Sequence, residues 1–249
     1  MEFPRPLIPA TLIKRYKRFL ADVELADGTV VTAHCANPGA MTGLKAAGLK
    51  VWLEPNDDPK RKLKFSWKLA EISGDDGSAW VGIDTSLPNK VVGEALAARA
   101  VPELAHYSGV RAEVKYGLNS RIDFLLTETG YPDCYVEVKN AHLRRSGRWA
   151  EFPDSVTKRG AKHLGEMAEM VRAGARAVTL FLVQRDDCDG FRLAGDIDPA
   201  YAAATRMAKD AGVETIVYGT LINTSGVTLG AAMRLGEAFM GDTQPDNLD

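Results

Sequence analysis

The chain has 249 residues, 45% of them hydrophobic, and a formal net charge of −2 at pH 7. This length suits one large or two small domains, and no apolar run approaches the roughly 20 residues that cross a membrane. Three widely spaced cysteines without a C-x-x-C pair, and a start that lacks the apolar segment of a signal peptide, predict a reduced, cytoplasmic protein without structural zinc.

Residues 1–84 are expected to form a first, all-β domain. Candidate strands cover residues 10–24, 29–35, 50–54, 64–73 and 79–84. Turn sequences such as Asp27-Gly28 and Asn37-Pro38-Gly39 separate them. Five short strands of this kind fit an OB-like barrel, a fold that binds nucleic acid on one face. The loop over 37–43 is interpreted as a tight connector, with a place beside a ligand as the alternative.

Two basic runs lie in this first domain. Their cations are Lys14, Arg15, Lys17 and Arg18 in the first run and Lys60, Arg61, Lys62 and Lys64 in the second. Aromatic residues are interleaved with both runs, among them Phe19 and Phe65. Basic surfaces with exposed rings are typical of binding to single-stranded or non-specific DNA. The pattern fits RNA equally well, and a solvated strand face is the alternative for each run.

The second domain, residues 85–235, is expected to open with a helix over 89–105 that carries Glu94 near its start. A meander of three strands should follow, over 111–116, 121–126 and 134–140. The first of these strands carries Glu113-Val114-Lys115. We interpret that segment as a polar strand face, and Glu113 would reach the site described next only if the register of the first hairpin allows it.

The second and third strands of the meander carry acids at mid-strand positions. A hairpin centred on Gly130 would place Asp123 directly opposite Glu137, with Cβ atoms roughly 5 Å apart. The opposite, core-facing side would carry Ile122, Phe124, Val136 and Val138.

Two opposed carboxylates repel each other, and a hard cation removes the conflict, since Mg²⁺ binds through one or two carboxylates, water and substrate phosphate. We therefore expect Asp123 and Glu137 to hold Mg²⁺ or Mn²⁺, and Lys139 to act on the attacking water. A solvated strand face with ion pairs is the alternative.

A helix over 157–173 should follow the meander, with Arg159 and His163 four residues apart on one side. Cations at a helix start are unexpected because the helix dipole favours acids there, so these two side chains are predicted to contact phosphate. A solvated basic turn is the alternative. A buried strand (177–183), a helix (198–212) and a strand (215–218) should extend the sheet, and residues 236–249 should form a disordered tail.

This order of elements resembles the PD-(D/E)XK nuclease superfamily. Asp123 stands where the superfamily has its metal-binding Asp, and Glu137-Val138-Lys139 stands at its E-x-K. Glu94 is a candidate for the additional helix acid of some members. The proline that gives the motif its name is absent, since Arg121-Ile122 precedes Asp123.

A longer set of motifs resembles the sugar fermentation stimulation protein family. The matching segments are residues 14–23, 37–43, 113–117 and 121–124, and Phe152-Pro153-Asp154 with Thr157, Arg159-Gly160 and His163-Leu164. The resemblance implies an α+β chain in which an N-terminal OB-like barrel precedes a PD-(D/E)XK restriction-endonuclease-like mixed-sheet domain, and it implies DNA binding. A homodimer is compatible with it.

Two functions remain open at this point. The first is a Mg²⁺- or Mn²⁺-dependent nuclease that hydrolyses phosphodiesters, with Asp123, Glu137, Lys139 and Glu94 in its catalytic site. The second is a non-catalytic, DNA-binding regulatory factor for sugar metabolism. Action on RNA or on a nucleotide is a third possibility.

Overall fold

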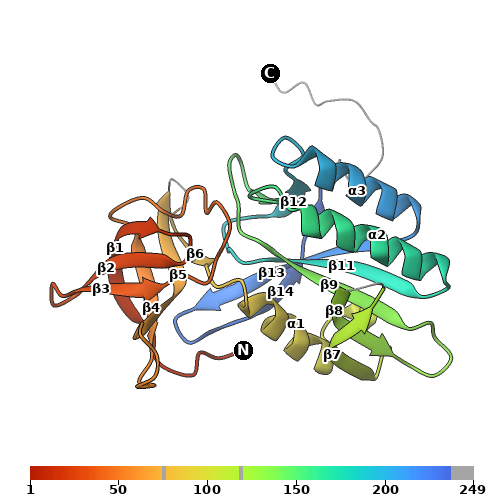
Figure 1. Ribbon diagram of the computed structural model, residues 1–249, viewed down its shortest axis with the longest axis horizontal. Helices are drawn as coiled ribbons and strands as arrows, with labels where there is room; N and C mark the ends of the chain where they lie inside the picture. Colours follow the sequence, from red (N-terminus) through yellow and green to blue (C-terminus); the bar gives the residue numbers. More distant parts are fainter. Residues whose placement is uncertain (75–76, 118–119, 237–249) are drawn as a thin grey trace.

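A computed structural model describes residues 1–74, 77–117 and 120–236. It shows two regions side by side: a small β-barrel and a larger mixed sheet with helices on both faces (Figure 1). The tail expected over 236–249 falls outside the described residues, except for Gly236.

The first region is a closed barrel. Its strands are β1 (Ile8–Tyr16), β2 (Leu20–Leu25), β3 (Val30–His34), β4 (Lys50–Pro55), β5 (Phe65–Gly74) and β6 (Gly77–Gly82). β1 pairs with β2 and β4, β4 pairs with β5, and β5 pairs in parallel with β3, so five strands close in the order β1-β2-β3-β5-β4. β6 extends the edge of β5. The expected OB-like barrel is thereby confirmed.

The first barrel strand was expected to run over 10–24 without interruption, and this expectation is wrong. Lys17 and Arg18 have φ angles of 47° and 63°, and they turn the chain back between β1 and β2. Leu12 lies before the turn and Ala21 and Val23 lie after it, all in the barrel core. The alternation of apolar residues continues from β1 into β2, so the sequence pattern resembles that of one long strand.

The second region is built on a six-stranded sheet in the order β14-β13-β11-β9-β8-β7. β7 (Gly109–Tyr116), β8 (Ser120–Thr127) and β9 (Cys134–Ala141) form the antiparallel meander that the sequence predicts. β11 (Arg176–Val183) and β13 (Glu214–Asn223) continue it in parallel, and β14 (Gly226–Ala232) closes the far edge. A small parallel sheet of β10 (Trp149–Phe152), β12 (Gly190–Leu193) and β15 (Arg234–Leu235) was not expected, because such short strands leave little periodicity.

Helices cover both faces of this sheet. α1 (Leu87–Ala97) packs on one face, and α2 (Lys158–Arg172) and α3 (Pro199–Asp210) pack on the other (Figure 1). α1 ends earlier than expected, because Arg99 has a φ of 55° and Val101 precedes a proline, a position that disfavours helix. A 3₁₀ turn, Pro102–Leu104, takes the place of the last helical turns.

The alternation of β8 slips at Asp123. Phe124 packs in the core under α1, whereas Ile122 and Leu125 pack in the core under α2 and α3. The expectation that Ile122 and Phe124 share a face is therefore wrong. Because of this slip, the Asp123 carboxylate lies between the core under α1 and the core under α2 and α3. In an ideal strand it would point to one face of the sheet.

Within the part of the chain that the structure describes, no helix has both the length and the apolar composition to cross a membrane.

Candidate active site

Asp123 lies where β8 and β9 separate. In the described residues their ladder runs from Leu126↔Cys134 to Phe124↔Val136 and ends there. One more step would set Asp123 opposite Glu137, in the predicted register, but the Asp123 carboxylate occupies the gap instead. Its Oδ2 accepts a hydrogen bond from the backbone N–H of Val138 (2.7 Å), and its Oδ1 accepts one from Nδ2 of Asn89 (2.7 Å). Burial raises the pKa of Asp123, and the charge of Glu137 raises it further.

Glu137 is a buried carboxylate with only one of its oxygens satisfied. The residue is 4% exposed. Its Oε1 lies 2.6 Å from Nζ of Lys139 and 2.7 Å from Nδ1 of His163. Burial works against ionisation, but these two partners outweigh it and lower the pKa of Glu137. Its Oε2 is buried and has no hydrogen-bond partner among the described residues. An ionised oxygen in that state is costly, and a ligand that brings positive charge would remove this cost.

His163 orients Glu137. Thr157 caps the start of α2 by accepting a hydrogen bond from the N–H of Gly160 (3.1 Å), which fixes the first turn. His163 is buried in the next turn, and its Nε2 accepts from Nε of Arg159 (3.3 Å). The proton therefore belongs on Nδ1, which donates to Glu137. The prediction that His163 contacts phosphate is wrong, because both ring nitrogens already have partners; Arg159 remains exposed beside it.

These side chains line a cleft of about 880 Å³, which we call the acidic cleft. Its walls come from both regions of the molecule. They consist of Pro38 and Thr85 on the barrel side, Asn89 on α1, Glu113, Ser120, Arg121, Asp123, Glu137, Val138 and Lys139 on the meander, and Thr157, Arg159, Gly160, Lys162 and His163 at the start of α2. Four cations line it, Arg121, Lys139, Arg159 and Lys162. Among the described residues, no three His, Cys, Asp or Glu side chains are grouped to hold a metal. Two carboxylates completed by water and substrate is the donor set that suits Mg²⁺.

Glu94 is not part of this arrangement. Its carboxylate is 62% exposed and pairs with the N-terminal ammonium at 2.7 Å. A five-residue step along a helix turns the side chain by about 140° from the starting direction, so Asn89 and Glu94 cannot both point at Asp123. The prediction of Glu94 as the helix acid is wrong, and the helix supplies the Asn89 amide instead. Asn89 is not an acid, so a pattern of acidic residues does not indicate it.

Glu113 does reach the acidic cleft, as the alternative interpretation of its strand allowed. The pairs Ala112↔Phe124 and Val114↔Ile122 flank it, so Glu113 lies opposite Asp123 across β7 and β8. Its φ is 55°, a conformation that non-glycine residues rarely adopt and that tends to occur at functional sites. The first hairpin thus carries a strained acid into the cleft.

The first basic run mainly braces the barrel. The Arg15 guanidinium donates to the carbonyl oxygens of Arg18 (2.8 Å), Asn37 (2.7 Å) and Gly39 (3.1 Å). Arg18 donates to the carbonyl of Pro38 (3.2 Å). All three bonds come from Nη2, so this end of the Arg15 side chain braces the backbone, and a nucleic-acid contact of Arg15 stays a prediction. The other two cations of this run, Lys14 and Lys17, are exposed.

The second basic run has a different environment. Arg61 and Lys62 line a groove of about 680 Å³ on the barrel, which we call the barrel groove. Lys64 lines a smaller hollow, and its Nζ donates to the carbonyl of Asp58 (2.8 Å). Lys60 is exposed. These cations keep their charge available at the surface.

The loop over 37–43 connects the barrel to the acidic cleft. Gly39 packs so closely on Asp154 that a Cβ there would lie 2.2 Å from Oδ2, so the position requires glycine. The same carboxylate accepts from the N–H of Met41 (3.2 Å). Burial opposes its ionisation, but His142 outweighs burial and the pKa of Asp154 falls to about 2. The loop is therefore docked on the second domain, which places Pro38 at the acidic cleft.

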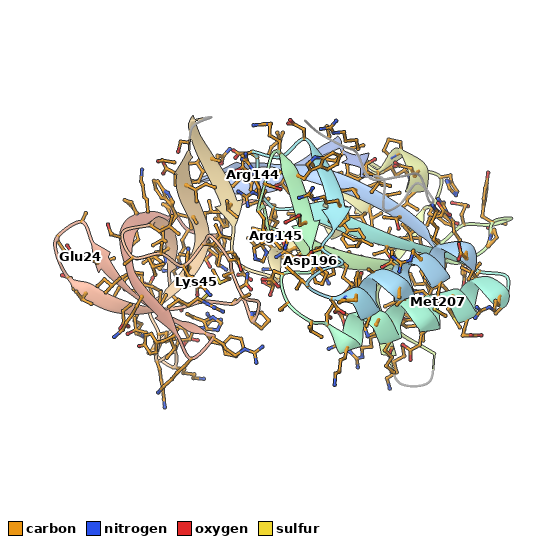
Figure 2. All side chains as sticks on the ribbon, turned by 90° about the horizontal axis from the view of Figure 1, so that it is seen from above. Glu24, Lys45, Arg144, Arg145, Asp196 and Met207 are labelled. Atoms are coloured by element: carbon orange, nitrogen blue, oxygen red, sulfur yellow. The ribbon has the colours of Figure 1, made fainter. Side chains whose placement is uncertain are left out.

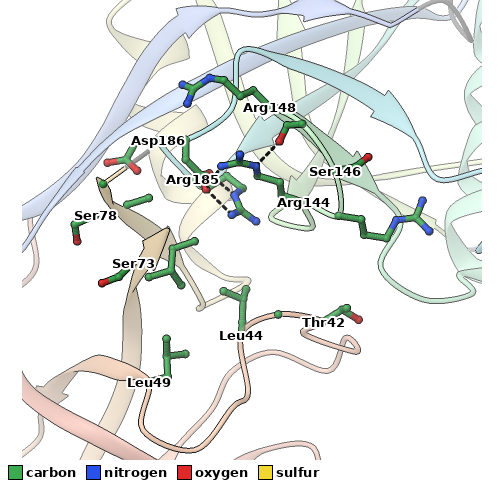
Figure 3. Close-up of a pocket in the computed structure, with 17 residues that line it drawn as sticks. Thr42, Leu44, Leu49, Ser73, Ser78, Arg144, Ser146, Arg148, Arg185 and Asp186 are labelled. Atoms are coloured by element: carbon green, nitrogen blue, oxygen red, sulfur yellow. Dashed lines mark hydrogen bonds and ion pairs between the residues drawn. The ribbon is translucent and has the colours of Figure 1, made fainter. Parts of the chain in front are cut away.

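A second cleft, of about 680 Å³, also lies between the two regions (Figure 3). We call it the arginine cleft, after Arg144, Arg145, Arg148 and Arg185 in its lining. Each of the four has a carboxylate partner. Asp187 binds Arg144 and Arg185, Asp189 binds Arg148, and Glu151 and Asp196 bind Arg145, with shortest distances of 2.5–2.6 Å. Figure 2 labels Arg144, Arg145 and Asp196. The positive charges of the arginine cleft therefore form ion pairs that hold segments of the protein together.

The fold agrees with comparisons to known proteins. The family model of the sugar fermentation stimulation protein RE domain matches residues 86–226, and that of the SfsA N-terminal OB domain matches residues 13–83. A sugar fermentation stimulation protein homolog of Dinoroseobacter shibae is 62% identical over 99% of this chain and 100% of its own length. A homolog of Ruegeria sp. is 61% identical over 92% of this chain and 98% of its own length.

A solved structure, SfsA of Pyrococcus furiosus in complex with Ca²⁺, is similar with a TM-score of 0.83 and 26% identity over 95% of this chain and 98% of that one. An OB-like barrel and a restriction-endonuclease-like mixed sheet together make up the fold that these matches share. The chain belongs to the sugar fermentation stimulation protein family.

Proposed function

We propose that this protein is a divalent-metal-dependent nuclease that hydrolyses phosphodiester bonds in DNA. The observation that carries the proposal is Oε2 of Glu137, a buried oxygen of an ionised carboxylate without a partner, in a cleft that also holds Asp123 and four cations. Lys139 and His163 contact only Oε1, so a purely structural role would leave Oε2 buried without a partner. A hard cation supplies one, and the cations of the cleft suit the phosphate that such an ion binds.

Each side chain has a role in this chemistry. Asp123 and Glu137 would hold Mg²⁺ or Mn²⁺, which when bound polarises the phosphoryl oxygen and lowers the pKa of a water. Lys139, 2.6 Å from Glu137, can orient the attacking water and offset the charge that grows on phosphate. His163 fixes the direction of Glu137, as a hydrogen-bonded partner does for a metal ligand. Arg159 at the rim supplies a forked donor for a phosphate.

The Ca²⁺ in the solved Pyrococcus furiosus relative supports a divalent site, since Ca²⁺ also takes oxygen ligands. That ion belongs to the relative, and the choice of Mg²⁺ or Mn²⁺ here rests on the two-carboxylate donor set.

The test is cleavage of plasmid and of single-stranded DNA with Mg²⁺, Mn²⁺, Ca²⁺ or EDTA. We expect cleavage with Mg²⁺ or Mn²⁺ and none with EDTA. Asp123→Asn should abolish it, and Lys139→Ala should lower the rate about 10²–10³-fold, the range for loss of one group that stabilises the developing charge. Lys45→Ala, an exposed lysine on the barrel that lines neither cleft, should cleave like the parent protein (Figure 2).

DNA binding without cleavage by folded, metal-loaded protein in every condition would reject the nuclease. That outcome would favour the alternative function, a non-catalytic DNA-binding regulatory factor.

A further inference from the structure

We propose that the substrate is single-stranded DNA, and that one strand runs along the barrel groove into the acidic cleft, so that the barrel docks the strand which the second domain cuts. This inference rests on the proposed nuclease function for its cutting step, whereas the docking step stands on the groove itself.

The barrel groove carries an excess of positive charge. Its cations are Arg5, Arg61, Lys62, Lys68 and Lys90, against the acids Glu54 and Asp84. Lys68 binds both acids, Asp84 at 2.6 Å and Glu54 at 3.2 Å, which leaves one negative charge in this group, and Arg5 pairs with Asp57. Arg61, Lys62 and Lys90 are all exposed in the groove. Such a surface complements a chain of phosphates.

The groove and the acidic cleft share a rim. Asp84 and Ser86 line the groove, whereas Thr85 between them lines the cleft. On α1, Asn89 lines the cleft and the next residue, Lys90, lines the groove. Consecutive Cα atoms are about 3.8 Å apart, so the two depressions are separated by about the width of one residue.

The rim itself is fixed. The N–H and the hydroxyl of Thr85 both donate to the carbonyl of Ala36, at 3.0 and 2.9 Å. Ala36 lines the groove, and Pro38, two residues on, lines the cleft. A strand that leaves the groove over this rim therefore arrives beside Asn89 and Asp123.

The groove also continues in the other direction. A hollow of about 330 Å³ shares Pro55 and Asn56 with it, and Asp57, Lys64 and Phe65 complete the hollow. The continuous path thus extends from Phe65 on the barrel, through the groove, to the carboxylates of the acidic cleft. It includes the cations Lys64, Arg61 and Lys62 of the second basic run.

Aromatic rings on this path and directly beside it favour a single strand over a duplex. Phe19 is 45% exposed and stacks on His34, with ring centroids 6.5 Å apart and an angle of 25° between planes. His34 lines the groove, and Phe65 lies at its far end. Rings of this kind stack on bases that are free of a partner strand, whereas the bases of a duplex are already stacked and paired.

Binding in EDTA tests the docking step without cleavage. Fluorescence anisotropy would compare labelled oligothymidylates of increasing length, matched duplexes and oligouridylate. We expect the single DNA strand to bind at least about tenfold more tightly than the duplex, and its affinity to rise with length and then level off. Arg61→Ala combined with Lys62→Ala should weaken binding and reduce the salt slope by about 2, one for each phosphate that the variant no longer neutralises. Phe19→Ala should weaken single-strand binding about fivefold or more, the lower end for removal of one stacking ring.

Lys45→Ala is the matched control and should bind like the parent protein. Duplex binding as tight as single-strand binding, or an Arg61/Lys62 double variant that binds like Lys45→Ala, would overturn the route. Tighter binding of oligouridylate than of oligothymidylate would overturn DNA as the strand.

Cleavage in Mn²⁺ then separates this inference from the proposed function. For long single strands the Arg61/Lys62 double variant should raise KM with little change in kcat, because neither residue lies in the acidic cleft. Oligonucleotides too short to reach the groove should be cut equally by variant and parent protein. If no DNA is cut while the binding results are as expected, the proposed nuclease function is rejected and the docking of single-stranded DNA on the barrel is supported. If duplex and single strand are cut equally and the double variant has no effect, the nuclease stands and the route fails.

Discussion

The acidic cleft and the arginine cleft lie between the same two regions of the molecule, and both concentrate charge. In the arginine cleft, each of the four guanidiniums has a carboxylate partner. In the acidic cleft, Oε2 of Glu137 has none among the described residues, and burial raises the pKa of Asp123. Charges whose atoms all have partners join the parts of a protein, whereas a buried charged group with an unpartnered atom or a shifted pKa indicates chemistry.

The largest expected effect on stability comes from removing a charge in the arginine cleft. Asp187→Asn would leave Arg185, which is 5% exposed, with a buried and weakly paired charge. Breaking one side of a buried pair costs about 3–5 kcal/mol. Urea unfolding would measure this loss. Asp189→Asn is the matched control, because its pair with Arg148 is about half exposed and such surface pairs contribute little to stability. Equal losses in the two variants would contradict the distinction between compensated, buried charge and surface charge.

Metal addition should distinguish the clefts next. An ion that binds only the folded state at about 100 times its dissociation constant stabilises it by about 2.7 kcal/mol. Thermal melts with and without Mn²⁺ should show this gain for the parent protein and for Asp189→Asn. Asp123→Asn and Glu137→Gln should lose it.

Without metal, Asp123→Asn should melt at or above the parent temperature at neutral pH. Burial raises the pKa of Asp123 in the folded state, so its ionised form opposes folding there. A metal-free variant that melts well below the parent protein would show that Asp123 is structural.

Acid should weaken the arginine cleft. Burial opposes ionisation of Asp187, but Arg185 outweighs it and lowers the pKa of Asp187 to about 2. Since the unfolded value is about 3.9, the folded state gains stability that is present above about pH 5 and is lost as the pH falls toward 2. The contribution is about 2 kcal/mol at neutral pH. The difference in unfolding free energy between the parent protein and Asp187→Asn should shrink over this range, and a constant difference would contradict the assignment.

The smallest expected effect concerns Glu113. Its φ of 55° costs about 1–2 kcal/mol for a non-glycine residue, and glycine there loses about 0.5–1 kcal/mol through its freer unfolded state. Glu113→Gly should therefore gain about 0.5–1 kcal/mol in urea unfolding and lose cleavage activity. Glu113→Gln, which keeps the strain without the charge, should show no such gain. Unchanged cleavage in both variants would show that the strained acid has no part in the reaction.

The sequence predicts the barrel, the meander and the acids Asp123 and Glu137, because mid-strand acids and alternating apolar residues are local patterns. It does not predict the contacts that assign roles to the other polar residues. Arg15 and Arg61 look alike in a basic run, yet only the folded barrel brings three carbonyl oxygens to Arg15. Similarly, Glu94 is the acid that the helix sequence offers, and only the orientation of α1 in the fold shows that Asn89 faces Asp123. The gap between β8 and β9 arises from tertiary packing and leaves no periodic signal.

The close packing of Gly39 on Asp154 has a consequence for how this protein can be varied. A barrel from another protein could fold stably and carry a basic surface. Without the contact between Gly39 and Asp154, however, the acidic cleft would lack the wall that contains Pro38. The two domains are therefore not interchangeable modules. An insertion in the loop over 37–43 would leave both cores intact and still alter the width of the acidic cleft. The barrel therefore limits the size of the substrate that can enter this cleft.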